Sequence, residues 1–226
     1  MTGFRTVRKE VSVTFTEKKS RFIANVKPVK SEEEAISHIN FMKNKFHDAR
    51  HNVYAYCIKT FDLSNLESGN ILGNISERYS DDGEPQGTAG LPVLEVIKKN
   101  SLINLCIVVT RYFGGILLGA PGLVRAYGKS TALGLESAGI CEMLFCRTVC
   151  VKIDYSLISQ VQRAIEGANI SLKQFFIDRI EYGESACVFV NVLRGFDVDF
   201  ERFITEITNA RYELVPIANT LVVSPW

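Results

Sequence analysis

The order of predicted elements in the second half of the chain most constrains the fold. Alternating apolar residues predict strands at 148–155, 171–177, 186–193 and 211–223. Helical spacing of apolar residues predicts helices from Ser156 to the Gly167–Asn169 region and at 199–209. Strand, helix, strand, strand, helix, strand is the order of a ferredoxin-like split pattern. We therefore expect an α+β chain whose residues 146–226 form a ferredoxin-like (βαββαβ) C-terminal domain.

The first half predicts a different α+β unit, which we assign to residues 1–145. Strands are expected at 11–15, 20–29, 51–59 and 102–110, with helices at 89–99 and 123–137. Ser31, followed by three glutamates, predicts a further capped helix, with Ile36, Ile39, Phe41 and Phe46 as its apolar positions. Residues 61–74 are polar and glycine-bearing, which indicates a loop.

Charge gives little guidance to function. The chain of 226 residues has 26 Lys and Arg against 25 Asp and Glu, so no global basic field indicates a nucleic-acid binder. Residues 1–146 have a small basic excess, and residues 147–226 are slightly acidic and could contact a protein partner. The N-terminus has no apolar signal-peptide core, and no apolar stretch reaches the roughly 20 residues that span a bilayer. We expect a cytoplasmic protein with no membrane partner.

The cysteines and histidines do not indicate a metal site. The six cysteines include no Cys-x-x-Cys pair, and zinc sites need ligands at recurrent spacings. His47 and His51 are four residues apart, but a strand is expected to begin near His51, which removes the helical geometry of a metal pair. We expect neither a metal nor a cofactor, with His51 buried or lining a site.

An acidic segment, residues 79–90, is a first candidate site. Its candidate residues are Asp81, Asp82, Gly83, Glu84, Gly87 and Thr88. Clustered carboxylates raise one another's pKa unless a cation or an arginine compensates them. The alternative is a solvated acidic turn that caps the following helix.

A glycine-rich segment, residues 108–127, is the second candidate. A buried strand is expected to end at Arg111, a glycine-rich loop follows, and a helix is expected to open near Gly122. Backbone N–H groups at a helix N-terminus favour phosphate, and aromatic side chains can stack on bases. The residues of this nucleic-acid or anion site are Arg111, Tyr112, Gly114, Gly115, Gly119, Gly122, Arg125 and Lys129. The alternative is a tightly packed corner in which Arg111 pairs with Asp81, Asp82 or Glu84.

Together the two segments resemble the YigZ/IMPACT family, in its bacterial branch. The matching pieces are Asp81–Pro85, Gly87–Gly90, Thr110–Gly115, Leu118–Gly119 and Leu123–Tyr127, with Ser20–Ile23 and His51–Asn52 at the expected places. Leu117 and Pro121 depart from bacterial relatives, which often have lysine and glycine there. The missing lysine weakens a phosphate-binding argument.

The resemblance implies a fold and a field of action. It implies an N-terminal domain like the second domain of ribosomal protein S5, followed by a ferredoxin-like domain, and the family's eukaryotic branch acts in control of translation. We therefore favour a noncatalytic protein that binds RNA or the ribosome and influences translation. Two alternatives remain. One is an enzyme or binder of a phosphate-containing small ligand at Asp81, Asp82, Glu84 and Arg111, with His51 able to take a proton; the other is a purely structural lock.

Overall fold

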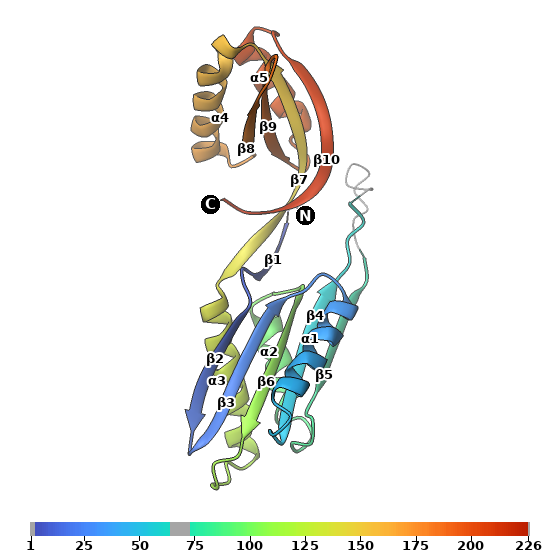
Figure 1. Ribbon diagram of the computed structural model, residues 1–226, viewed down its shortest axis with the longest axis vertical. Coiled ribbons are helices and arrows are strands. Elements are labelled where there is room, and N and C mark those ends of the chain that lie inside the picture. The colour runs from blue at the N-terminus through green and yellow to red at the C-terminus, as the bar shows by residue number, and fades with distance from the viewer. Residues whose placement is uncertain (1–2, 64–72, 226) are drawn as a thin grey trace. The chain divides into compact units, whose positions relative to one another are not determined.

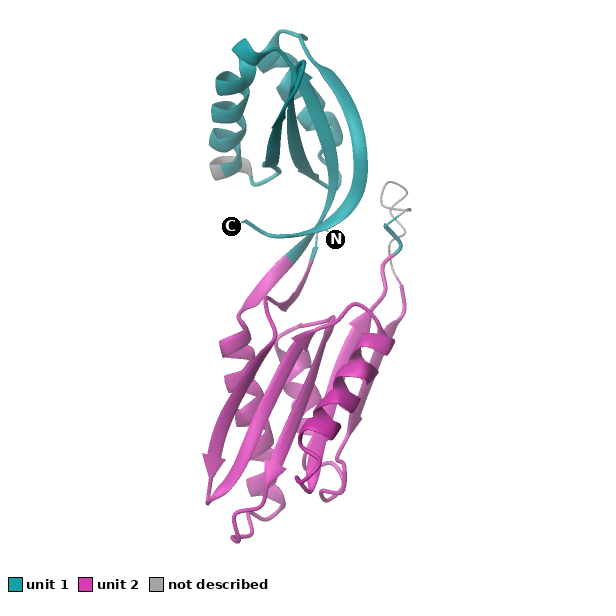
Figure 2. Ribbon diagram, viewed as in Figure 1, with its two compact units in different colours: residues 1–3, 62–71, 143–226 teal, residues 4–61, 72–142 magenta. Residues whose placement is uncertain are grey.

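The chain is a mixed α/β protein of two compact units. The computed structural model describes residues 3–63 and 73–225. Unit 1 comprises residues 1–3, 62–71 and 143–226, and unit 2 comprises residues 4–61 and 72–142 (Figure 2). The described residues contain two antiparallel sheets and five α-helices.

Unit 2 contains a five-stranded sheet in the order β2-β3-β6-β4-β5 (Figure 1). Its strands are β2 (Val11–Glu17), β3 (Ser20–Pro28), β4 (His51–Lys59), β5 (Ile75–Ser80) and β6 (Leu105–Tyr112). β6 is central and almost entirely buried, because helices cover both faces of the sheet. Its register opposes Arg111 to His51 on one side and to Phe22 on the other, so the end of β6 meets the starts of β3 and β4.

The helices of unit 2 lie on opposite faces of this sheet. α1 (Glu32–Lys45) packs on one face through a small cluster that includes Ile39, Met42, Tyr56 and Val108. α2 (Gly90–Lys99) and α3 (Ala120–Ala138) cover the other face, where the larger core gathers. Successive residues of a strand point to opposite faces of the sheet, so alternate residues of each strand pack into the cluster under α1 and the cluster under α2 and α3.

Unit 1 contains most of the second sheet. The elements in chain order are β7 (Ile140–Ile153), a 3₁₀ turn (Tyr155–Leu157), α4 (Ile158–Leu172), β8 (Phe175–Tyr182), β9 (Ala186–Leu193), α5 (Asp197–Thr208) and β10 (Glu213–Val223). β10 pairs with β7, β7 with β9, and β9 with β8, all antiparallel. β1 (Gly3–Val7) also joins β7, and the residues of both strands are divided between the units. The core of unit 1 gathers where α4 and α5 pack on the sheet.

Most of the predicted elements are confirmed. The strands at 51–59 and 186–193 have the predicted bounds, and the alternation of strands and helices in the second half is as predicted. Ser31 caps α1 as expected, since its hydroxyl accepts a hydrogen bond from the Glu34 backbone N–H. The loop predicted at 61–74 lies largely outside the described residues.

Other predictions need correction. Two strands, β1 and β5, were not predicted. β5 is an edge strand whose residues are mostly exposed, so its sequence lacks apolar alternation. β7 begins eight residues earlier than predicted, and β8 runs from Phe175 to Tyr182 rather than over 171–177. α4 continues past Gly167 and Asn169. On α1, Ile36 and Phe41 are exposed, and Ala35, His38 and Met42 are buried instead.

Candidate functional site

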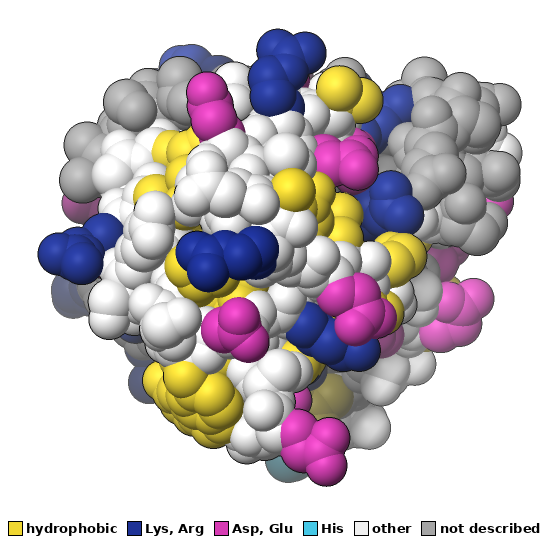
Figure 3. Space-filling view, turned by 90° about the horizontal axis from the view of Figure 1, so that it is seen from above, with side chains coloured by type: hydrophobic (Ala, Val, Ile, Leu, Met, Phe, Trp, Pro, Cys, Tyr) yellow, Lys and Arg dark blue, Asp and Glu magenta, His cyan; other side chains and the backbone are white. Residues whose placement is uncertain are grey.

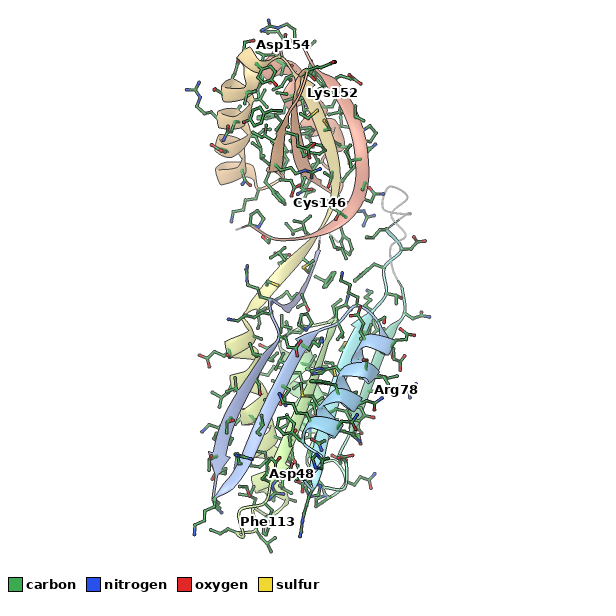
Figure 4. The ribbon with its side chains drawn as sticks, viewed as in Figure 1. Asp48, Arg78, Phe113, Cys146, Lys152 and Asp154 are labelled. Atoms are coloured by element: carbon green, nitrogen blue, oxygen red, sulfur yellow. The ribbon has the colours of Figure 1, made fainter. Side chains whose placement is uncertain are left out.

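Four segments meet at one end of unit 2, which we call the loop end: residues 18–19, 46–50, 81–89 and 113–119. The strand register brings them together, because β3 and β4 start where β5 and β6 finish. Gly114 packs directly on the backbone of Lys19, where a Cβ would lie 2.0 Å from the carbonyl carbon. The Tyr112 hydroxyl donates to Asp48 Oδ1 at 2.7 Å, and Asp48 and Phe113 lie at this end (Figure 4).

Asp81 caps the N-terminus of α2. Its Oδ1 accepts hydrogen bonds from the backbone N–H groups of Ala89 (3.0 Å) and Gly90 (2.8 Å), and its Oδ2 from that of Gly87 (2.8 Å). A carboxylate in this position satisfies N–H groups that the helix leaves without partners and complements the helix dipole. Three backbone donors therefore occupy the Asp81 carboxylate. This arrangement agrees with the second interpretation of the acidic segment, a turn that caps the following helix.

Asp82 joins the acidic loop to β4 and α1. Its carboxylate receives Lys43 Nζ at 2.7 Å and the backbone N–H of Asn52 at 2.7 Å. The Asp82 carbonyl lies 2.9 Å from His51 Nδ1, and since a carbonyl only accepts, that nitrogen carries the proton. Neighbouring Gly83 has a φ of +87° and stands close to the His51 ring, which suits a residue without a Cβ.

Glu84 forms a buried cluster with Arg111 and Tyr127. Its Oε1 lies 2.7 Å from Arg111 Nη1 and accepts a hydrogen bond from the Tyr127 hydroxyl at 2.8 Å. His51 Nε2 is 4.0 Å from the same oxygen. Burial raises the pKa of the Tyr127 hydroxyl, and the nearby Glu84 charge adds to the effect.

Arg111 is buried, with 5% of its surface exposed. Its guanidinium lies 5.6 Å from the Phe22 ring and 5.6 Å from the Phe113 ring, and its Nη2 is 3.4 Å from Ser20 Oγ. Its partner is Glu84, one of the three carboxylates considered from the sequence. An anion from solvent would have to displace this pair. The predicted anion-binding role of Arg111 stays a prediction.

The glycine-rich loop is largely exposed. Gly115 and Gly119 have φ values of +84° and +71°, and a Cβ at either would meet nothing within 4 Å. Phe113, Ile116 and Leu117 are exposed, Leu117 to 83%. α3 begins at Ala120, two residues before the predicted opening near Gly122, and Gly119 is its N-cap.

The remaining predicted residues lie around this loop. Arg125 and Lys129 are exposed on α3, and Lys129 Nζ lies 4.7 Å from the centre of the Phe15 ring on β2. The Thr88 hydroxyl donates to the Pro85 carbonyl at 2.7 Å, so it closes the acidic turn. A Cβ on Gly122 would lie 3.1 Å from Leu118 Cβ, which indicates a packing role.

The loop end contains functional candidates that the sequence did not single out. Lys18 and Lys19 form the β2–β3 turn, with φ values of +43° and +66°, and are exposed. Arg50 is exposed beside Asp48, and Arg21 stacks its guanidinium 4.4 Å from the centre of the Tyr112 ring. Arg21 lies within the Ser20–Ile23 piece of the family resemblance. For the other three residues the only sequence signal was the mild basic excess of the first half, which does not say where the charge collects.

The geometry argues against metal chemistry at the acidic segment. Asp81, Asp82 and Glu84 turn to three different sets of partners, namely the α2 backbone, Lys43 and Arg111. Among the residues that the structure describes, no group of three or more His, Cys, Asp or Glu is placed to hold a metal ion.

The buried cysteines elsewhere in the chain are also poor metal ligands. Burial raises the pKa of the Cys106 and Cys146 thiols to about 12, which disfavours the thiolate that binds metals.

Other surfaces give less distinct signals. Figure 3 shows a face on which Lys and Arg side chains alternate with Asp and Glu and with hydrophobic side chains. No helix in the described part of the chain is long and apolar enough to cross a membrane.

Comparisons with known proteins give consistent relatives. Residues 18–135 match a family model described as the Impact N-terminal domain. The IMPACT family member YvyE of Bacillus subtilis (strain 168) is 38% identical over 196 residues, covering 87% of this chain and 82% of that protein. The IMPACT family member YigZ of Escherichia coli (strain K12) is 40% identical over 118 residues, covering 52% of this chain and 53% of that protein. A crystal structure of a hypothetical protein aligns with a TM-score of 0.56 and 24% identity over 96% of this chain and 98% of that one, which shows a shared fold.

Proposed function

Because the chain belongs to the IMPACT family, we propose that it is a noncatalytic protein that binds RNA or the ribosome and takes part in the regulation of translation. The family resemblance seen in the sequence is confirmed by these relatives. Control of translation is what that resemblance implied for the family's eukaryotic branch. The observation that carries the proposal for this chain is the distribution of charge at the loop end.

Positive charge at the loop end is free, whereas negative charge there is mostly engaged. Lys18, Lys19 and Arg50 at the loop end, and Arg125 near the start of the adjoining α3, are exposed and form no ion pair with any residue that the structure describes. The carboxylates of the acidic loop, in contrast, are held by backbone N–H groups, by Lys43 and by Arg111. The charged side chains that remain available to a ligand are therefore mostly cations, and cations bind phosphate groups.

Aromatic side chains at the same end suit an RNA partner. Phe113 is 44% exposed in the loop after β6. Tyr112 presents a ring that already stacks against the Arg21 guanidinium. Aromatic rings and arginine planes are the groups on which unpaired bases stack. Lysines beside such rings favour a partner with both phosphates and accessible bases.

We further propose the finer fold assignment and the location. The strand order β10-β7-β9-β8 and the βαββαβ chain order support a ferredoxin-like domain at residues 146–226. The five-stranded sheet with helices on both faces supports an S5 domain 2-like domain at residues 1–145. Action on translation corresponds to a cytoplasmic location, and the C-terminal domain could then contact a protein partner.

The alternative function has less support. An enzyme or a binder of phosphate-containing small ligands would need the acidic loop and Arg111 to face one pocket. Glu84 and Arg111 neutralise each other in a buried pair, and Asp81 is fully engaged as a cap. Calorimetric titration with magnesium, manganese and nucleotides tests this alternative, and we expect no heat of binding.

Co-sedimentation with ribosomes and with RNA across a salt series tests the main proposal. Substituting Lys18, Lys19 and Arg125 together with alanine removes three free cations. For a single strand the slope of log K against log salt changes by about 0.7 per phosphate contact, so the slope should become shallower by about 2. Arg111 stays unchanged in this variant, because its loss would disturb the buried cluster.

A matched control removes the same charge from the opposite end of unit 2. Lys9 precedes β2, Lys30 precedes α1 and Lys99 ends α2, and all three are exposed. Alanine at these three positions should leave binding unchanged. Binding that is insensitive to salt, or equal weakening by both triple variants, would overturn the proposal.

A further inference from the structure

One edge of the sheet in unit 2 is left without a partner. β2 is the terminal strand, and its backbone pairs with β3 over all seven residues from Val11 to Glu17 (Figure 1). The described part of the chain contributes no backbone hydrogen bond to the other side of β2. A free strand edge is a row of unpaired N–H and C=O groups that can accept another strand.

The other edge strands among the described residues carry features that block such pairing. β1, which ends the strand order of the second sheet, has the exposed Arg5 in its middle. β5 has Glu77 and Arg78 in its middle. β8 has a register irregularity between Ile177 and Arg179 and carries charged side chains there. β10 contains Pro216 next to another irregularity. Charges, bulges and proline are the usual means by which strand edges are protected.

β2 has none of these features within its first six residues. The sequence Val-Ser-Val-Thr-Phe-Thr is uncharged and rich in residues that favour strands, and its register with β3 is regular. Val11 and Phe15 pack against the core of unit 2, and Ser12, Thr14 and Thr16 are exposed on the opposite face. The contrast with β5, β8 and β10 indicates an edge kept open for pairing.

We propose that β2 is an interface at which a second copy of this chain adds its own β2, antiparallel, to make one continuous sheet about a two-fold axis at Thr14. This inference does not depend on the proposed RNA binding. The register that pairs all seven residues places Thr14 opposite Thr14 of the other copy. It also places Val13 opposite Phe15 and Ser12 opposite Thr16, so apolar meets apolar and hydroxyl meets hydroxyl at these pairs, while Val11 lies opposite Glu17 at each end.

Charge at the strand ends favours the same occupant. In this register Glu10 of one copy lies toward Lys18 of the other, and the two-fold axis repeats the contact at the opposite end. Both side chains are exposed, and the Glu10 carboxylate also lies 3.2 Å from Lys27 Nζ of its own copy, an exposed ion pair that a second cation can share. A second copy therefore offers complementary hydroxyl, apolar and charged groups in a single register, and a symmetric antiparallel pairing closes as a dimer.

Sedimentation equilibrium of the full chain, in a concentration series reaching about 1 mM, tests the proposal. The wild-type chain should show a monomer–dimer equilibrium. Thr14→Lys and Thr14→Glu each place like charges across the axis and should shift the chain to monomer. A mixture of the two variants should restore the dimer, because residue 14 meets itself only in this register. Thr14→Val, which adds no charge, is the control and should still dimerise.

Several results would overturn the proposal. These are a wild-type chain that stays monomeric throughout the series, a dimer that Thr14→Lys leaves intact, and a mixture of Thr14→Lys and Thr14→Glu that stays monomeric. Thr14 is exposed, so both charged variants should retain the wild-type circular dichroism spectrum. That control separates loss of pairing from loss of fold.

Discussion

Removing the charge of Glu84 should destabilise unit 2 more than any surface substitution. The Glu84 side chain is 4% exposed and the Arg111 side chain 6% exposed, with 2.7 Å between Oε1 and Nη1. Glu84→Gln preserves the volume of the side chain but leaves the guanidinium in the interior without a counter-charge. Removal of one partner from a buried ion pair costs about 3–5 kcal/mol.

Loss of the neighbouring hydrogen bond from Tyr127 to Glu84 should lower the free energy of unfolding by a smaller amount. Tyr127→Phe deletes the hydroxyl that donates to the same carboxylate oxygen at 2.8 Å. A hydrogen bond to a charged group contributes about 1.5–3 kcal/mol to stability. We therefore expect Glu84→Gln to cost more than Tyr127→Phe, and Arg125→Ala, on the exposed surface of α3, to cost less than about 0.5 kcal/mol.

Urea unfolding followed by far-UV circular dichroism measures these losses. Amide hydrogen exchange at β6, which is central in its sheet, assigns the change to unit 2. A double-mutant cycle with Glu84→Gln and Arg111→Met should show that the double variant loses less than the sum of the single losses, by about 2 kcal/mol. If Glu84→Gln and Arg111→Met each unfold within about 1 kcal/mol of the wild type, the buried pair does not stabilise the fold.

Three further predictions concern other groups. Asp81→Ala should cost about 1–2 kcal/mol in urea unfolding, because the carboxylate caps α2 through three N–H groups; an unchanged midpoint would refute the capping role. Burial lowers the pKa of His38, so the unfolded chain binds the proton first and stability should fall as the pH drops below about 6.5, by up to about 1.4 kcal/mol per pH unit. In His38→Leu, unfolding measured over the same pH range should lose this contribution. Cys106 and Cys146, with pKa values raised to about 12 by burial, should react with a thiol reagent at neutral pH only after unfolding, which mass spectrometry of labelled peptides checks.

The fold was predictable wherever local pattern and burial agree. β4 alternates in contact with two cores, and its predicted bounds were the observed ones. β5 was missed because an edge strand needs no apolar face, so its sequence resembles that of a loop. Gly167 was expected to end α4, but a glycine inside a helix costs only about 1 kcal/mol, and the helix continues to Leu172.

The sequence predicted which residues belong to the candidate site, but not which of them would pair with one another. Sequence reasoning selected the acidic loop and the strand end that carries Arg111, and the structure brings them together through Glu84. Which of three carboxylates would pair with Arg111 could not be decided, because the choice depends on the side-chain directions set by the Asp81 cap and the turn at Gly83. Lys18 and Lys19 were missed because they adjoin the other segments only through the pairing of β3 with β6.

The loop end and its surroundings contain both tightly packed glycines and freely exposed side chains, and this contrast has an evolutionary consequence. Gly90 and Gly114 lie so close to the backbones of Ser80 and Lys19 that a side chain at either position would clash. The loop that carries Leu117, in contrast, exposes most of that side chain to solvent. The exposed loop residues can therefore change among related chains at little cost in stability, whereas selection for folding acts against any side chain at Gly90 or Gly114.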